Sequence, residues 1–114
     1  MLYFILILYF SVAMLGIFLF VKLYSKNPPK LVTGIIHGSL GLLGLALIIG
    51  YMSFQKGDVP VYGFFFLLIA FFFGGGMIAT TLSGKKYPKL ILFFHIAFAL
   101  TGLYLLFTFG ISKF

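Results

Sequence analysis

The sequence predicts an all-α integral membrane protein, an antiparallel bundle of four transmembrane helices that forms one domain, residues 1–114. Composition is the first reason: 63% of the residues are hydrophobic and 8% are charged, too apolar a mixture for a soluble chain of this size. The second reason is the length of the apolar stretches, about 20 residues each, which suits a helix crossing the hydrocarbon layer. The third is that these stretches are continuously apolar, whereas strands of a membrane barrel alternate.

Four apolar spans follow one another, separated by short polar breaks. We expect them at residues 2–21, 31–54, 61–82 and 90–111. No basic residue precedes the first span and lysines follow it directly, so it is predicted to be a membrane helix rather than a signal peptide. In the third span, Gly75 and Ala79 form a small-residue stripe, which is expected to pack inside the bundle or against a second copy in a homodimer.

The net charge of +7 is distributed unevenly along the chain. The first and third breaks contain Lys22, Lys26, Lys30, Lys85, Lys86 and Lys89. By the positive-inside tendency, loops 22–30 and 83–89 are cytoplasmic and both termini lie outside. The lysines are expected to meet anionic membrane lipid, and no nucleic acid partner is predicted, because the chain has no basic soluble surface interleaved with aromatic residues. The absence of cysteine excludes thiolate metal sites and thiol catalysis.

The only two histidines stand in two similar stretches of the chain. Residues 29–47 read PKLVTGIIHGSLGLLGLAL and residues 88–105 read PKLILFFHIAFALTGLYL. The second and fourth helices run in the same direction, so His37 and His95 are predicted to lie at the same depth, roughly 10 Å from the boundary. In an up-down bundle these helices are diagonal, and both side chains can project into the centre. This arrangement indicates a ligand or metal held between the two histidines.

Small residues accompany both histidines on the same helical faces. Gly34, Gly41 and Gly44 share the face of His37, and Ala99 and Gly102 share that of His95. A flat macrocycle can lie against the backbone of a helix only where the side chains are small. Histidine is a common axial ligand of haem iron. We therefore expect one haem b per protomer as the cofactor, with His37 and His95 as its two axial ligands.

Three polar residues lie near the boundary above the histidines. Lys30 and Lys89 precede His37 and His95 by about two helical turns, where they can meet the haem propionates. Thr33 stands four residues before His37 and is expected to accept the second ring N–H, which would fix the tautomer.

Other readings of the same residues remain open. Glycines spaced at four residues also let membrane helices pack closely, and a histidine inside the membrane can simply bond to a neighbouring helix. A bare metal site is the weaker reading of the histidine pair, because Asp58, the only acid, lies in a loop and two imidazoles leave zinc or copper under-coordinated.

Four short helices with single histidines in the second and fourth resemble the small membrane b-type cytochromes of bacterial inner membranes. The resemblance covers the bundle plan and the two histidine stretches. It implies haem b, a location in the inner membrane, and electron transfer to or from a quinone or a redox partner protein. Some members of that group hold two haems with four histidines, whereas this chain can ligate one. The small multidrug transporters match in size only, because residues 2–21 lack the glutamate on which they depend.

Three classes of function are therefore compatible with the sequence. The first is a haem-binding electron-transfer protein, in which the cofactor supplies the chemistry. The second is a small transporter or carrier of haem, a metal or another solute. The third is a non-catalytic membrane subunit with structural histidines. The sequence contains no recognisable nucleophile–base pair, so an enzyme of this sequence would be a redox enzyme.

Overall fold

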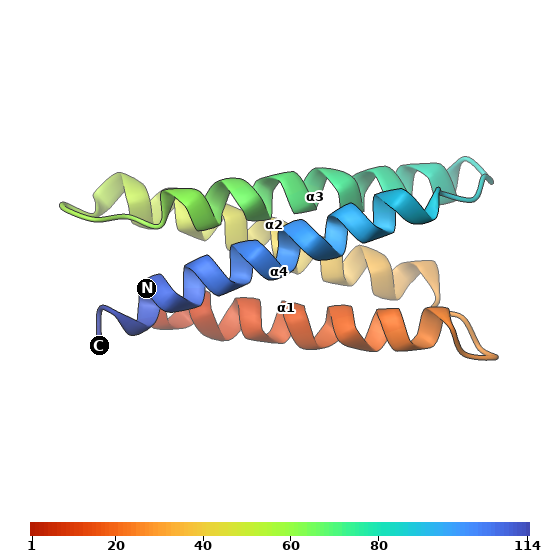
Figure 1. Ribbon diagram of the computed structural model, residues 1–114, viewed down its shortest axis with the longest axis horizontal. Helices are drawn as coiled ribbons and strands as arrows, with labels where there is room; N and C mark the ends of the chain where they lie inside the picture. The colour runs from red at the N-terminus through yellow and green to blue at the C-terminus, as the bar shows by residue number, and fades with distance from the viewer.

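The computed structural model describes residues 1–114 and contains four helices and no strands. They are α1 (Leu2–Leu23), α2 (Leu31–Phe54), α3 (Val61–Leu82) and α4 (Lys89–Ile111). They form an elongated antiparallel bundle of 46 × 21 × 21 Å (Figure 1). Each helix is long and apolar enough to cross a membrane, so the predicted fold class is confirmed. The helix ends agree with the expected spans to within two residues.

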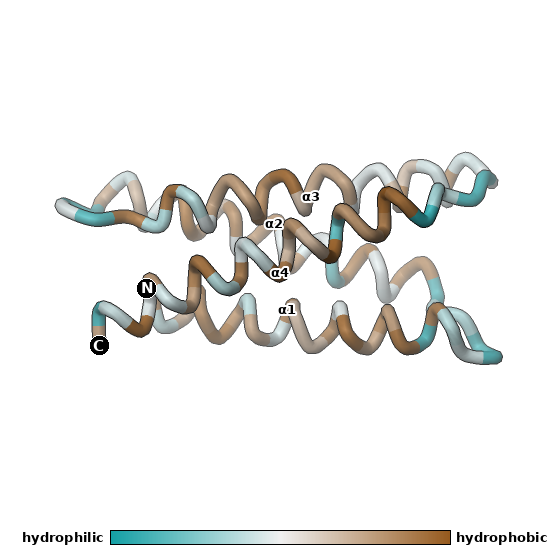
Figure 2. The backbone as a smooth tube through the Cα atoms, viewed as in Figure 1, coloured by the Kyte–Doolittle hydropathy of each residue, from teal (hydrophilic) through white to brown (hydrophobic).

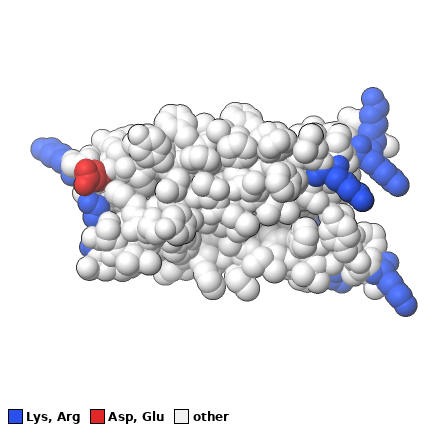
Figure 3. Space-filling view, viewed as in Figure 1, with Lys and Arg blue, Asp and Glu red and all other residues white.

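Most of the strongly hydrophilic residues lie at the two ends of the bundle, with a few along the helices between them (Figure 2). The end that carries the α1–α2 and α3–α4 loops also carries most of the lysines, while the chain termini and the α2–α3 loop lie at the other end (Figure 3). Proline directly precedes two of the helices: Pro60 is the N-cap of α3, and Pro88 is the N-cap of α4. After α3 the chain turns through Gly84, whose φ of +76° favours glycine. We call the two ends the lysine-rich end and the terminal end.

Each helix packs against two others. α1 contacts α2 and α4, and α3 contacts α2 and α4, whereas α2 and α4 lie on one diagonal and α1 and α3 on the other. The most extensive contact joins α3 to α4. A Cβ on Gly63 would lie 3.1 Å from the backbone nitrogen of Leu106, and a Cβ on Gly102 would lie 3.0 Å from that of Leu67, so the two helix backbones nearly touch. This arrangement places the two histidine-bearing helices across the bundle from each other, as predicted.

The hydrophobic core occupies only the terminal half of the bundle. The buried hydrophobic residues are Leu2, Ile5, Leu6, Tyr9, Val12, Leu45, Ile48, Phe64, Leu67, Ala70 and Leu106. In contrast, residues 13–43 and 71–101, which form the lysine-rich half, include no buried residue. Within this half, Phe73 stacks on Phe94 and Phe98 and links α3 to α4. The bundle is therefore closely packed at one end and loosely packed at the other.

The two helical hairpins, α1–α2 and α3–α4, repeat the same packing at a spacing of 58 residues. A Cβ on Gly44 would meet the ring of Tyr9, and a Cβ on Gly102 would meet the side chain of Leu67. Both the glycines, 44 and 102, and their partners, 9 and 67, are 58 positions apart. The chain is thus a tandem pair of similar hairpins arranged about a pseudo-two-fold axis along the bundle.

The small-residue stripe expected in the third helix lies outside the bundle. Gly75 and Ala79 are exposed, and a Cβ on Gly75 would meet nothing within 4 Å. The stripe therefore does not serve the bundle interior. The close helix contacts use Gly63, Gly102 and Gly110 instead, where a Cβ would lie within 3.1 Å of a neighbouring helix.

Candidate functional site: the histidine pair

His37 and His95 face each other across the diagonal of the bundle. Each stands six residues after the first residue of its helix, Leu31 and Lys89, so the two side chains lie at the same level. Their ring centroids are 6.2 Å apart and their planes are inclined by 76°. Both side chains are half-buried and lie in the lysine-rich half of the bundle. The predicted juxtaposition of the two histidines is therefore present.

His95 is oriented by the backbone of α3. Its Nδ1 atom lies 2.7 Å from the carbonyl oxygen of Ala70. A carbonyl can only accept, so Nδ1 carries the proton and donates, which leaves Nε2 with a free lone pair. The ring lies against Gly74, where a Cβ would come within 3.0 Å of Cε1. Histidine ligands of metals are usually oriented in this way, with the second nitrogen donating to a backbone carbonyl.

His37 occupies the equivalent place against α1. A Cβ on Gly16 would come within 3.1 Å of its Cε1 atom, just as Gly74 approaches His95. Its Nδ1 is buried and is directed towards the carbonyl group of Val12, but no hydrogen bond is formed. Hence one histidine of the pair is fixed by a hydrogen bond, and the other makes a looser contact with the equivalent carbonyl.

These contacts show that the 58-residue repeat also includes α1 and α3. Positions 12 and 70, 16 and 74, and 37 and 95 are each 58 residues apart. Gly16 and Gly74 provide the space in which each imidazole lies, yet neither was among the predicted site residues. The signal was present in the sequence as a glycine at the same spacing as the histidines, in the first and third spans.

The predicted small residues divide into two groups. A Cβ on Gly34 or Gly41 would meet nothing within 4 Å, so open space adjoins α2 on both sides of His37. Gly44 and Gly102 are covered by Tyr9 and Leu67 and belong to the packed core. Ala99 is half-buried. The small residues therefore do not form one continuous slot, because those seven positions after each histidine lie in the terminal half.

The expected hydrogen bond from His37 to Thr33 is absent, and that prediction is wrong. His37 turns its Nδ1 towards α1, whereas Thr33 lines a polar cavity between the ends of α1 and α2. Lys30 lines the same cavity, and Lys89 is exposed at the start of α4. Lys30 and Lys89 thus lie at the lysine-rich end above the histidines, as expected. Lys30, however, lines a cavity that does not include His37.

Two imidazoles are the entire donor set of the site. The structure brings together no group of three or more His, Cys, Asp or Glu residues. Two imidazoles that bind one metal from opposite sides, with metal–nitrogen bonds of about 2.0 Å, place their ring centroids roughly 6 to 6.5 Å apart. The observed separation of 6.2 Å agrees with such a pair. The same separation is also typical of two aromatic rings in edge contact.

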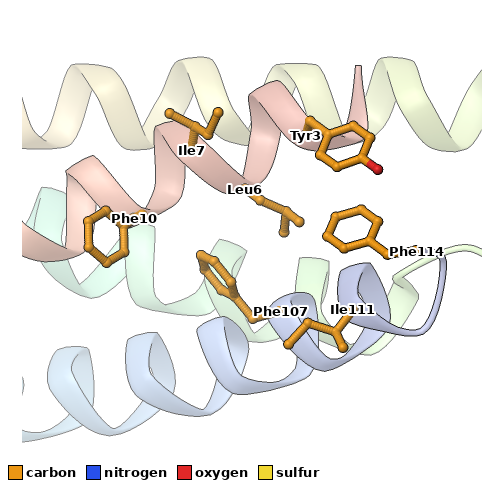
Figure 4. A pocket seen from close by; sticks show the side chains of 7 residues that line it. All are labelled: Tyr3, Leu6, Ile7, Phe10, Phe107, Ile111 and Phe114. Atoms are coloured by element: carbon orange, nitrogen blue, oxygen red, sulfur yellow. The ribbon is translucent and has the colours of Figure 1, made fainter.

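A second cavity, at the terminal end, has a different character. It measures about 330 Å³ and lies between α1 and α4 (Figure 4). Its lining is hydrophobic throughout: Tyr3, Leu6, Ile7, Phe10, Phe107, Ile111 and Phe114. Such a surface can contact an acyl chain, but it offers no charge to hold a head group.

No protein-family model, curated protein or solved structure matches this chain. The functional argument therefore depends on the geometry of the histidine pair itself.

Proposed function

We propose that the protein is a b-type cytochrome, in which His37 and His95 are the axial ligands of one haem b and the physiological role is electron transfer. The observation that carries the proposal is the separation of 6.2 Å between two imidazoles projecting from diagonal helices at the same depth. Ionisable side chains inside a membrane are costly, and their presence is a functional indication. When bound, haem b supplies a one-electron couple at its iron.

The surrounding residues support this role in three ways. The hydrogen bond from His95 to the Ala70 carbonyl keeps Nε2 available as a ligand. Gly34 and Gly41, on the helical face of His37, have no neighbouring atom within 4 Å of a Cβ position, so no side chain of the protein covers these positions. Lys89 at the lysine-rich end can meet a propionate. Occupation of both axial positions by histidine favours electron transfer over oxygen binding, and a quinone or a redox protein is the proposed partner.

One observation favours a second candidate function. The bond between His95 Nδ1 and the Ala70 carbonyl, at 2.7 Å, joins α4 to α3. In a non-catalytic membrane subunit this bond alone would account for a histidine inside the membrane. It accounts less well for His37, whose Nδ1 approaches the carbonyl of Val12 on α1 without the geometry of a hydrogen bond. The haem proposal accounts for both histidines and is therefore preferred.

The wild-type visible spectrum tests the proposal directly. Full-length protein purified after expression with added haem precursor should contain one haem b per chain. It should show the Soret band and the sharp visible bands of six-coordinate low-spin haem after reduction with dithionite, because two imidazoles impose a strong axial field. Colourless protein after haem supplementation and direct haem reconstitution would overturn the assignment.

We propose further that the protein lies in a bacterial inner membrane, with the lysine-rich end in the cytoplasm. The support is the uneven charge: six lysines at that end against Lys56 and Lys113 at the other. A cysteine introduced at Gly57, in a chain that has no natural cysteine, should react with an impermeant maleimide added outside intact spheroplasts. A cysteine at Ser83 should react only after lysis, and the reverse pattern would contradict the orientation.

A further inference from the structure

A polar cavity of about 240 Å³ lies between the last turn of α1 and the first turn of α2, in the lysine-rich half. It is lined by Lys22, Asn27, Pro28, Pro29, Lys30 and Thr33, with Phe18 as the only hydrophobic residue. Lys22 holds its Nζ atom 5.9 Å from the centroid of the Phe18 ring. The cavity is separate from the histidine pair.

The polar groups around this cavity have no partners within the protein. Thr33 is the one threonine whose hydroxyl makes no hydrogen bond, since Thr80, Thr81, Thr101 and Thr108 each donate to a carbonyl of their own helix. The Asn27 side chain makes no hydrogen bond either. Asp58, the only acid, pairs with Lys113 at the opposite end of the bundle. The residues Lys22, Asn27, Lys30 and Thr33 therefore line one space, and the only acid of the chain lies at the other end of the bundle.

The polar residues that line the cavity are not repeated in the second hairpin, although the hairpins are otherwise similar. The residues 58 positions after Lys22 and Thr33 are Thr80 and Ile91. Thr80 donates its hydroxyl to the carbonyl of Gly76, so it is not available to a ligand. The α3–α4 loop nevertheless carries its own lysines. Lysines at the membrane boundary are thus common to both hairpins, and the combination of Lys22 with Thr33 is specific to the first.

We infer that this cavity binds a phosphate group, with Lys22 and Lys30 neutralising its charge and Thr33 and Asn27 donating hydrogen bonds. Phosphate oxygens are acceptors only, which matches a set of lysine, hydroxyl and amide donors. The cavity lies at the level where a helix that spans the membrane meets the lipid head groups, so an anionic phospholipid is the expected source. The inference does not depend on haem or on the orientation of the chain.

Native mass spectrometry of the full-length chain in a neutral detergent tests this site. Wild-type protein should retain one dioleoyl phosphatidylglycerol in preference to dioleoyl phosphatidylcholine. The double variant Lys22→Gln, Lys30→Gln should bind it about 25-fold more weakly, since each lysine near an anionic lipid contributes about fivefold. Thr33→Val keeps the side-chain shape and should also weaken binding. The matched control is Lys85→Gln, Lys86→Gln, which removes the same charge from the other hairpin and should retain the lipid.

A parallel titration with inorganic phosphate identifies the source of the phosphate group. If inorganic phosphate binds with the same dependence on Lys22 and Lys30, the site accepts free phosphate; if only the lipid binds, the head group is the ligand. Two results would overturn the inference. One is equal loss of phosphatidylglycerol from the cavity variant and from the control. The other is a wild-type protein that neither prefers phosphatidylglycerol nor binds phosphate. Circular dichroism of each variant verifies that the helices are retained.

Discussion

Replacement of either His37 or His95 by alanine is expected to abolish low-spin haem almost completely. One iron needs both imidazoles for six-coordination, so the two single variants should lose the low-spin spectrum equally although only His95 makes a hydrogen bond. The measurement is the visible and electron paramagnetic resonance spectrum of each haem-supplemented variant. Any residual haem should be high-spin or readily lost.

A control on the same helix separates ligation from folding. Ser39 is exposed two residues after His37 and its hydroxyl makes no hydrogen bond, so Ser39→Ala should retain the wild-type spectrum. A structural histidine behaves differently. If His95 only joined α4 to α3, its loss would lower stability by about 0.6 kcal/mol, the average for such bonds in membranes, and leave any haem in place. The proposal is contradicted if the double variant His37→Ala, His95→Ala purifies with one low-spin haem per chain.

The second large effect is expected at Gly63, where α3 lies directly against the backbone of α4. A side chain there would collide with the backbone nitrogen of Leu106, at 3.1 Å from the Cβ, and with the carbonyl oxygen of Gly102, at 3.3 Å. Backbone atoms cannot rotate out of the way, so Gly63→Leu must force the helices apart. Overpacking in well-packed cores costs about 1–3 kcal/mol or more. Reversible unfolding in mixed micelles should show a loss of at least this size.

Gly75→Leu on the same helix is the matched control for this substitution. Gly75 is exposed and has no neighbour within 4 Å of its Cβ position, so the leucine should leave the stability of the single chain nearly unchanged. Equal losses from the two variants would contradict the packing described for α3. The same variant tests the expected homodimer: dissociation of a dimer by Gly75→Leu, with the protomer intact, would place the contact on this exposed stripe.

Much of the fold follows from the sequence because lipid leaves few alternatives. Every backbone group must bond within its own segment, so apolar length alone specifies the spans. The largest difference is at the end of α1, which extends past the predicted residue 21 to Leu23 and includes Lys22. A lysine can continue a helix at the boundary because its long stem reaches the polar layer. Short loops then place α2 and α4 on a diagonal, which is why the histidine pair was predictable.

The finer contacts of the site could not be predicted, because they depend on how each helix is rotated about its axis. Spacing along α2 puts Gly44 on the same face as His37, but the crossing of α1 covers Gly44 with Tyr9 and leaves Gly41 open. Thr33 was assigned to His37 from spacing alone, although the imidazole turns towards α1. Gly16 and Gly74 were missed because the repeat was compared only between the histidine helices.

The pseudo-two-fold arrangement lets the two hairpins carry different residues at equivalent positions. Two identical hairpins meeting in this way would form an isologous dimer, with a single histidine pair on its axis and every other feature present twice. The α2–α3 loop joins the halves covalently, so assembly is intramolecular, at an effective concentration that reaches about millimolar for short flexible tethers. Joined halves can also differ: Lys22 and Thr33 face a polar cavity in one hairpin, while Thr80 and Ile91 hold the equivalent positions in the other. A shared axial site and a one-sided polar site therefore coexist in a chain of 114 residues, which no symmetric dimer of hairpins allows.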